Sequence, residues 1–285
     1  ARLKSWTRRP VFRTRLRLVG FILLLAGIGW AVTSLDLAWD DLSLPFLARN
    51  VLVFTPAVLV VSAVTFRVTA VAAGTAVTPG QAISTVAHAN VAELLPLPGG
   101  AMVRGAALVD AGARAAVATK LVLLTALLTL GLTLAVSSAA LAVLDRSFWG
   151  WFAIPTLIGV GIVLGLLSQH AQPRFLVWMV LLRIVSLGLM AARMVLAFAA
   201  LGDSITWLEG ALYALAPTLG AAVGILPAGL GLNEAIAAGI ATLIASSPAT
   251  AFLAVALNRL LGLTVGAMFV FARAFAHTFG WGRGA

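Results

Sequence analysis

The chain has 285 residues, of which 62% are hydrophobic and 10% are charged, and its formal net charge is +10. A soluble protein of this length carries about a quarter charged residues, so the composition excludes an ordinary soluble domain. The absence of cysteine excludes disulfides, thiol catalysis and cysteine metal sites. Several apolar runs reach the roughly 20 residues needed to cross a bilayer and are continuous rather than alternating, which predicts an all-α polytopic membrane protein and not a β-barrel.

The first element is a basic segment, residues 1–16, that is expected in the cytoplasm. Seven of the 19 basic residues fall in the first 17 positions, directly before an apolar run. A basic flank of this kind orients a membrane protein with that end inside, and it can also hold anionic lipid headgroups. The clustering explains the positive charge, so no nucleic-acid partner is expected.

About six full spans are predicted within one integral membrane domain, residues 17–275. In chain order they cover 17–35, 47–66, 116–144, 151–169, 175–200 and 249–274. With the N-terminus in the cytoplasm, six crossings return the tail, 276–285, to the same side. Arg67 and Arg174 then fall inside and the acidic stretch LDLAWDDLS (35–43) falls outside, as expected for a multi-pass protein of the bacterial cytoplasmic (inner) membrane.

Two stretches, 81–112 and 209–245, do not fit the six-span count. Each has a moderately apolar segment, a break rich in proline and glycine, a charged residue and a second short apolar segment. The expected hinges of the two breaks are Pro96, Pro98, Gly99, Gly100, Pro227, Gly229 and Gly231. Because three full spans separate the stretches, they would enter from opposite faces as an inverted repeat of re-entrant broken helices, the arrangement that transporters use to bind substrate near the midplane. Two ordinary helical hairpins with proline kinks are the alternative.

Charged residues near these breaks form the candidate site. Asn233 could cap the helix that resumes at Glu234, but a carboxylate in the first turn of a helix gains only about 0.3–1 kcal/mol. A charge near the bilayer centre costs at least about 2.5–3.5 kcal/mol, so Glu234 needs a cationic partner, water or a proton. An arginine cannot shed its charge and must pair, face water or reach the interface. For Arg183, a side chain that reaches the interface stays open as an interpretation. The predicted headgroup-binding and translocation residues are Glu93, Arg104, Arg193, Asn233, Glu234, Asn258 and Arg259. No metal-ligand spacing is present, and no metal or cofactor is expected.

Three segments around these residues resemble the membrane-domain (flippase) family of lysyl-phosphatidylglycerol synthases. They are LPLPGGAMVRGAAL (95–108), LPAGLGLNEA (226–235) and ALNRLLGL (256–263), and the similarity extends from about residue 15 to 275. The family's arginine after the first break, glutamate after the second and later arginine correspond to Arg104, Glu234 and Arg259. Ala101 and Ala228 depart from the family's frequent polar residue and glycine. The resemblance implies a stand-alone member that translocates lipid, because no soluble aminoacyl-transfer domain follows residue 275.

The leading hypothesis is therefore a lipid flippase or transporter and not an enzyme. Its partner would be a membrane lipid, either a phospholipid that can be aminoacylated or a polyprenyl- or hopanoid-type lipid. The arginines would meet phosphate, and Glu234 a cationic group or a neighbouring arginine. Two other classes stay open. One is an integral membrane transferase or phosphatase, for which no nucleophile–base pair and no phosphate-cradling motif is present. The other is a non-transporting subunit that supports a lipid-synthesising or lipid-modifying enzyme. A second copy of the chain, giving a homo-oligomer, is another partner that the sequence leaves open.

Overall fold

The computed structural model describes residues 26, 28–35, 42–93, 99–144, 147–223 and 231–278. Within these ranges every regular element is a helix. In chain order they are α3 (Leu44–Arg49), η2 (Asn50–Phe54), α4 (Thr55–Ala72), α5 (Pro79–Ala92), α6 (Gly99–Asp110), α7 (Ala115–Val143), α8 (Ser147–Gly150), α9 (Ala153–Ser168), α10 (Pro173–Ala200), α11 (Trp207–Tyr213), α12 (Leu215–Val223), α13 (Leu232–Leu243) and α14 (Pro248–Thr278).

Five helical stretches in the described part of the chain are long and apolar enough to cross a membrane. They are Leu44–Ala72 (α3, η2 and α4 together), Ala115–Val143, Phe148–Ser168, Pro173–Ala200 and Pro248–Ala272. The second to sixth predicted spans are thus confirmed as long apolar helices. The second one continues to Ala72 instead of ending at 66, because Arg67 stays in the helix and its Nε donates to the carbonyl of Val77, 3.2 Å away. Of the first predicted span, 17–35, only residues 26 and 28–35 are described, and 28–34 are helical.

The outer faces of the long helices are apolar. On α9 the side chains of Leu157, Ile158 and Ile162 are more than half exposed, and on α10 Val177 and Trp178 are as exposed. Water does not favour such surfaces on this scale, whereas lipid tails do. An all-helical chain with several such helices is a multi-pass membrane protein.

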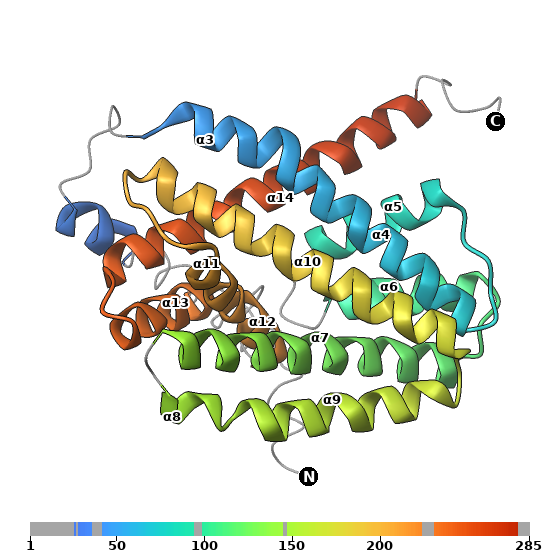
Figure 1. Ribbon diagram of the computed structural model, residues 1–285. Helices are drawn as coiled ribbons and strands as arrows, with labels where there is room; N and C mark the ends of the chain where they lie inside the picture. The colour runs from blue at the N-terminus through green and yellow to red at the C-terminus, as the bar shows by residue number, and fades with distance from the viewer. Residues whose placement is uncertain are drawn as a thin grey trace, which may run out of the picture.

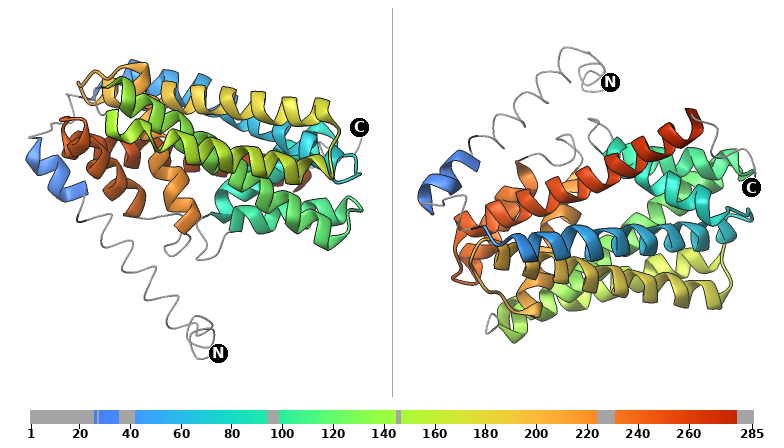
Figure 2. Two further views of the ribbon diagram at one scale, coloured as in Figure 1. Left: turned by 60° about the horizontal axis from the view of Figure 1, so that its bottom comes forward. Right: turned by 90° about the horizontal axis from the view of Figure 1, so that it is seen from above.

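The short helices lie in two groups toward opposite ends of the molecule (Figures 1 and 2). We call α5 and α6 the first unit, and α11, α12 and α13 the second unit. The first unit follows the end of α4 and precedes the start of α7, while the second follows the end of α10 and precedes the start of α14. Helix α14 runs from one unit to the other and packs against α13 and α5. The two units therefore share α14 as a neighbour.

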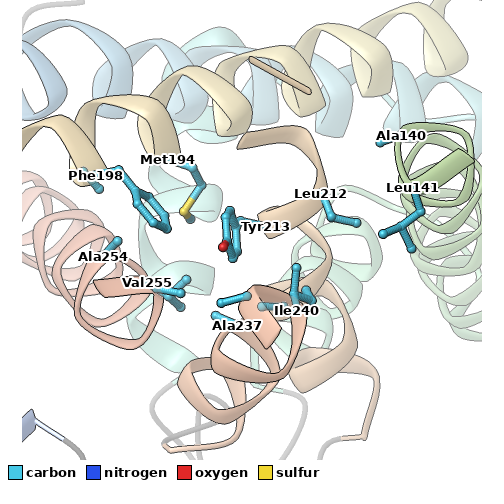
Figure 3. Close-up of a cluster of buried hydrophobic side chains, with 14 residues drawn as sticks. Ala140, Leu141, Met194, Phe198, Leu212, Tyr213, Ala237, Ile240, Ala254 and Val255 are labelled. Atoms are coloured by element: carbon cyan, nitrogen blue, oxygen red, sulfur yellow. The ribbon is translucent and has the colours of Figure 1, made fainter. Parts of the chain in front are cut away.

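Each unit has its own apolar core. In the first, Leu59 and Phe66 of α4 pack with Val86 of α5 and Leu108 of α6. In the second, side chains from α7, α10, α11, α13 and α14 meet (Figure 3). There the rings of Phe198 and Tyr213 lie 4.8 Å apart between centroids, and many partners are alanines, which let the helices approach closely.

Within the described residues, no helix of either unit is long enough to cross a membrane by itself. The longest, α5, has 14 residues and rises about 21 Å, against a hydrocarbon core of about 30 Å. Four expected hinges, Pro96, Pro98, Pro227 and Gly229, lie outside the described residues. The other three stand where the last helix of a unit begins: Gly99 and Gly100 open α6, and Gly231 precedes α13 with a left-handed φ of 77°.

Candidate functional site

A buried ion pair joins the second unit to the last long helix. Nη1 of Arg259 on α14 lies 3.0 Å from Oε1 of Glu234 on α13, and the side chains are 13% and 0% exposed. Glu234 stands about 14 Å along α13 from the helix end at Leu243, and Arg259 about 17 Å along α14 from Pro248. Both depths are near half of a 30 Å hydrocarbon core. The sequence predicted that Glu234 needs a cationic partner, water or a proton; the structure shows a cationic partner, and it is Arg259.

The ion pair leaves several polar atoms without a partner. Oε2 of Glu234, Nη2 of Arg259 and Oδ1 of the adjacent Asn258 are all buried and have no hydrogen bond to any described residue. An unsatisfied buried polar group costs about 1–3 kcal/mol. These atoms therefore favour binding of a polar group, such as water or part of a ligand, that supplies the missing bonds.

The expected capping role of Asn233 is wrong. Helix α13 begins at Leu232, and its N-cap is Gly231, whose positive φ of 77° turns the backbone into the helix without any side-chain cap. Asn233 is instead buried in the first turn, and its side chain lies directly against Gly220 of α12, where even a methyl group would overlap it. Asn233 thus faces α12, whereas Glu234 faces α14.

Arg193 is engaged by neutral groups of the protein. Its Nε donates to Oδ1 of Asn50 at 3.1 Å, and its Nη2 donates to the backbone carbonyl of Asn258 at 2.8 Å. The side-chain amide of Asn50 donates in turn to the backbone carbonyl of Arg193 at 3.1 Å. Asn258 directly precedes Arg259, so the contacts of Arg193 are linked through the backbone of α14 to the ion pair between Arg259 and Glu234. We call Asn50, Arg193, Asn258, Arg259 and Glu234 the buried network.

Three other charged side chains, Glu93, Arg104 and Arg183, have no ion pair or hydrogen bond to any described residue. We call them the open group. Glu93 is exposed, and Arg104 and Arg183 are half-buried. Arg104 interacts electrostatically with both Glu93 and Arg183, and Glu93 also interacts with Arg259 of the buried network. Two positive charges and one negative charge give the open group a formal charge of +1.

The backbone of the first unit fixes where the Glu93 carboxylate lies. A side chain at Gly100, in the first turn of α6, would come within 2.8 Å of Oε1 of Glu93. The carboxylate therefore sits at the N-terminus of α6, where the helix dipole favours a negative charge. Glu234 has the matching position in the first turn of α13, so both units have a carboxylate at the start of their last helix.

Asn50 is the one member of these clusters that has no signal in the sequence. Asn50 contacts Arg193, 143 positions away, through the one π-helical turn of the described chain, Asn50–Phe54. Arg183, which the sequence marks as an arginine inside a span, stands about 15 Å along α10 from Pro173. Among the described residues, no group of histidine, aspartate and glutamate side chains could hold a metal ion.

The fold and these clusters define a multi-pass helical membrane protein with charged side chains between its helices. Comparisons with protein-family models, with curated proteins and with solved structures find no match for the chain.

Proposed function

We propose that the protein is a lipid flippase or lipid transporter in which the open group binds a lipid headgroup during its passage across the membrane. A phosphate would lie between Arg104 and Arg183, and a cationic part of the headgroup would lie at Glu93. The acyl chains would stay in the bilayer, along the apolar outer faces of the long helices.

The observation that carries this proposal is a pair of arginines, Arg104 and Arg183, that have no ion pair or hydrogen bond to any described residue. A guanidinium keeps its charge at any accessible pH, and a charge inside a membrane must pair or reach water. The charges of Arg104 and Arg183 repel each other, and Glu93, which attracts Arg104, balances only one of them. An anion between them would relieve the repulsion, and the charge of +1 on the open group suits a headgroup with a net negative charge.

The re-entrant inverted repeat is part of the same proposal. Three long helices, Ala115–Val143, Phe148–Ser168 and Pro173–Ala200, separate the two units. An odd number of crossings would make the first unit enter from one face and the second from the other. Helices too short to cross, with carboxylates at their inner N-termini, support this arrangement, which places substrate sites near the midplane in other transporters.

The resemblance to the lysyl-phosphatidylglycerol synthase flippase family enters here as a proposal that rests on the residues around Arg104, Glu234 and Arg259. Under it, the protein is in a bacterial inner membrane with both termini in the cytoplasm. The first unit then enters from the cytoplasmic face and the second from the outer face. A second copy of the chain, or a lipid-synthesising enzyme, would be its protein partner.

Lipid retention tests the headgroup site. The protein is purified in mild detergent and its bound lipids are identified by native mass spectrometry. We expect anionic phospholipid on the wild type and much less on Arg104→Gln and Arg183→Gln. The control is Arg174→Gln, because Arg174 lies exposed at the start of α10 and loses the same charge outside the site. Equal retention by all four proteins would contradict the assignment.

A further inference from the structure

The charge of Arg193 has no counter-ion in the buried network. Its side chain is 5% exposed, and its hydrogen-bond partners are an amide oxygen, a backbone carbonyl and the sulfur of Met190 at 3.8 Å. A buried guanidinium held only by neutral groups costs free energy. The presence of Arg193 at this buried position is therefore explained by a role other than stabilising the fold.

The geometry of the contacts supplies that reason. The planar guanidinium points one edge at Asn50, near the start of the second predicted span, and another at the Asn258 carbonyl on α14. Asn50 is itself held by Thr55, whose hydroxyl donates to Oδ1 at 3.3 Å. Such a fork fixes direction as well as distance, which a lysine ammonium cannot do.

The turn of α14 that Arg193 holds is the turn that carries Arg259. On one side, Arg193 bonds the carbonyl of Asn258; on the other, Arg259 bonds Glu234 of the second unit. Gly262 makes the first contact sterically feasible, because a methyl group there would lie 3.3 Å from Nη2 of Arg193. Helix α14 is thus clamped between α10 and α13 at this level.

We propose that Arg193, with Asn50, is a positioning residue that sets the placement of Arg259 toward Glu234, and that it does not bind the headgroup itself. The consequence for transport rests on the proposed function, whereas the clamp rests on the hydrogen bonds alone. A rigid placement of Arg259 would keep Glu234 neutralised while Glu93, which also interacts with Arg259, stays exposed to the headgroup.

Two variants separate positioning from headgroup binding. Arg193→Lys keeps the charge but loses the fork, and Gly262→Ala keeps every charge but crowds Nη2 of Arg193, which must shift against the Asn258 carbonyl. We expect each to slow lipid translocation in reconstituted vesicles by about tenfold, in the range of couplings between contacting residues. Gly266→Ala is the matched control on the same helix, since a methyl group there meets its nearest neighbour at an ordinary 3.8 Å. It should translocate at the wild-type rate. Wild-type rates for Arg193→Lys and Gly262→Ala would overturn the proposal.

A second measurement keeps the clamp testable if the wild type moves no lipid. The thermal unfolding midpoint is measured for Gly262→Ala in the wild-type and Glu234→Gln backgrounds, with Gly266→Ala as the reference for adding a methyl group to this helix. If the clamp acts through Arg259, the loss caused by Gly262→Ala shrinks when Glu234 is already replaced. An equal loss in both backgrounds would overturn the clamp, whatever the outcome for transport.

Discussion

Replacing Glu234 with glutamine removes the counter-ion of the buried Arg259 guanidinium. In the native protein, Oε1 of Glu234 lies 3.0 Å from Nη1 of Arg259, and the carboxylate is fully buried. Removing one partner of a buried ion pair costs about 3–5 kcal/mol, because the other charge is left uncompensated. The glutamine carbonyl can still accept one hydrogen bond and the Arg259 side chain is 13% exposed, so we expect a loss of about 3 kcal/mol, at the lower end of this range.

The double variant shows whether the loss belongs to the pair. Glu234→Gln with Arg259→Gln has no unpaired charge at this position, so it should be less destabilised than the sum of the two single variants. We expect a coupling free energy of about 2–3 kcal/mol, because contacting residues in one network couple by about 0.5–3 kcal/mol. The measurement is the free energy of unfolding from circular dichroism, as the detergent in mixed micelles is replaced stepwise by dodecyl sulfate.

Additive losses would refute this reasoning. If the coupling is below about 0.5 kcal/mol, the two side chains behave as independent sites. Arg259 would then be stabilised by water or lipid and not by Glu234.

Two further predictions concern packing and topology. Gly220→Ala inserts a methyl group into the space of the Asn233 side chain and should destabilise the protein by about 1–3 kcal/mol. The control is Gly239→Ala on α13, which has open space around it and should leave the stability unchanged. Equal unfolding free energies for the two variants would contradict the contact between α12 and α13. Because the chain has no cysteine, single cysteines report topology directly: Ala76→Cys and Ser204→Cys should react with a membrane-impermeant maleimide from opposite faces. Met102→Cys, exposed near the start of α6, should not react from the face of Ser204, and labelling from that face would mean that α5 crosses the membrane.

The long helices were predictable because their signal is local. About 20 consecutive apolar residues identify a span wherever it packs, and five of the predicted spans appear as such helices. The short helices of the two units followed from proline and glycine at the breaks. Placing a charge at Glu234 costs more free energy than helix capping returns, so the sequence also predicted that Glu234 needs a cationic partner, water or a proton. This could be predicted because the cost of a buried charge depends on its depth and not on which group compensates it.

The contacts inside the site were less predictable, since they join distant parts of the chain. Nothing near Asn50 indicates that it meets Arg193, because the π-helical turn that places it has no clear sequence signature. Capping preferences favoured Asn233, but the chain enters α13 through Gly231 in a left-handed conformation that needs no side-chain cap. Arg183 could be counted with the site only once the fold showed its electrostatic interaction with Arg104 of α6.

Lipid translocation in vesicles of defined composition tests the central claim most directly. The purified protein is reconstituted with a fluorescent anionic phospholipid, and the fraction of label accessible to an impermeant quencher is followed over time. We predict that the wild type and Lys120→Gln, which removes an exposed charge of α7, exchange lipid between leaflets faster than protein-free vesicles. Arg104→Gln and Arg183→Gln should be at least about tenfold slower, the change expected when one charge-assisted contact of more than 1.4 kcal/mol is lost. A wild-type rate equal to that of protein-free vesicles, or unchanged rates for both arginine variants, would contradict translocation through the open group.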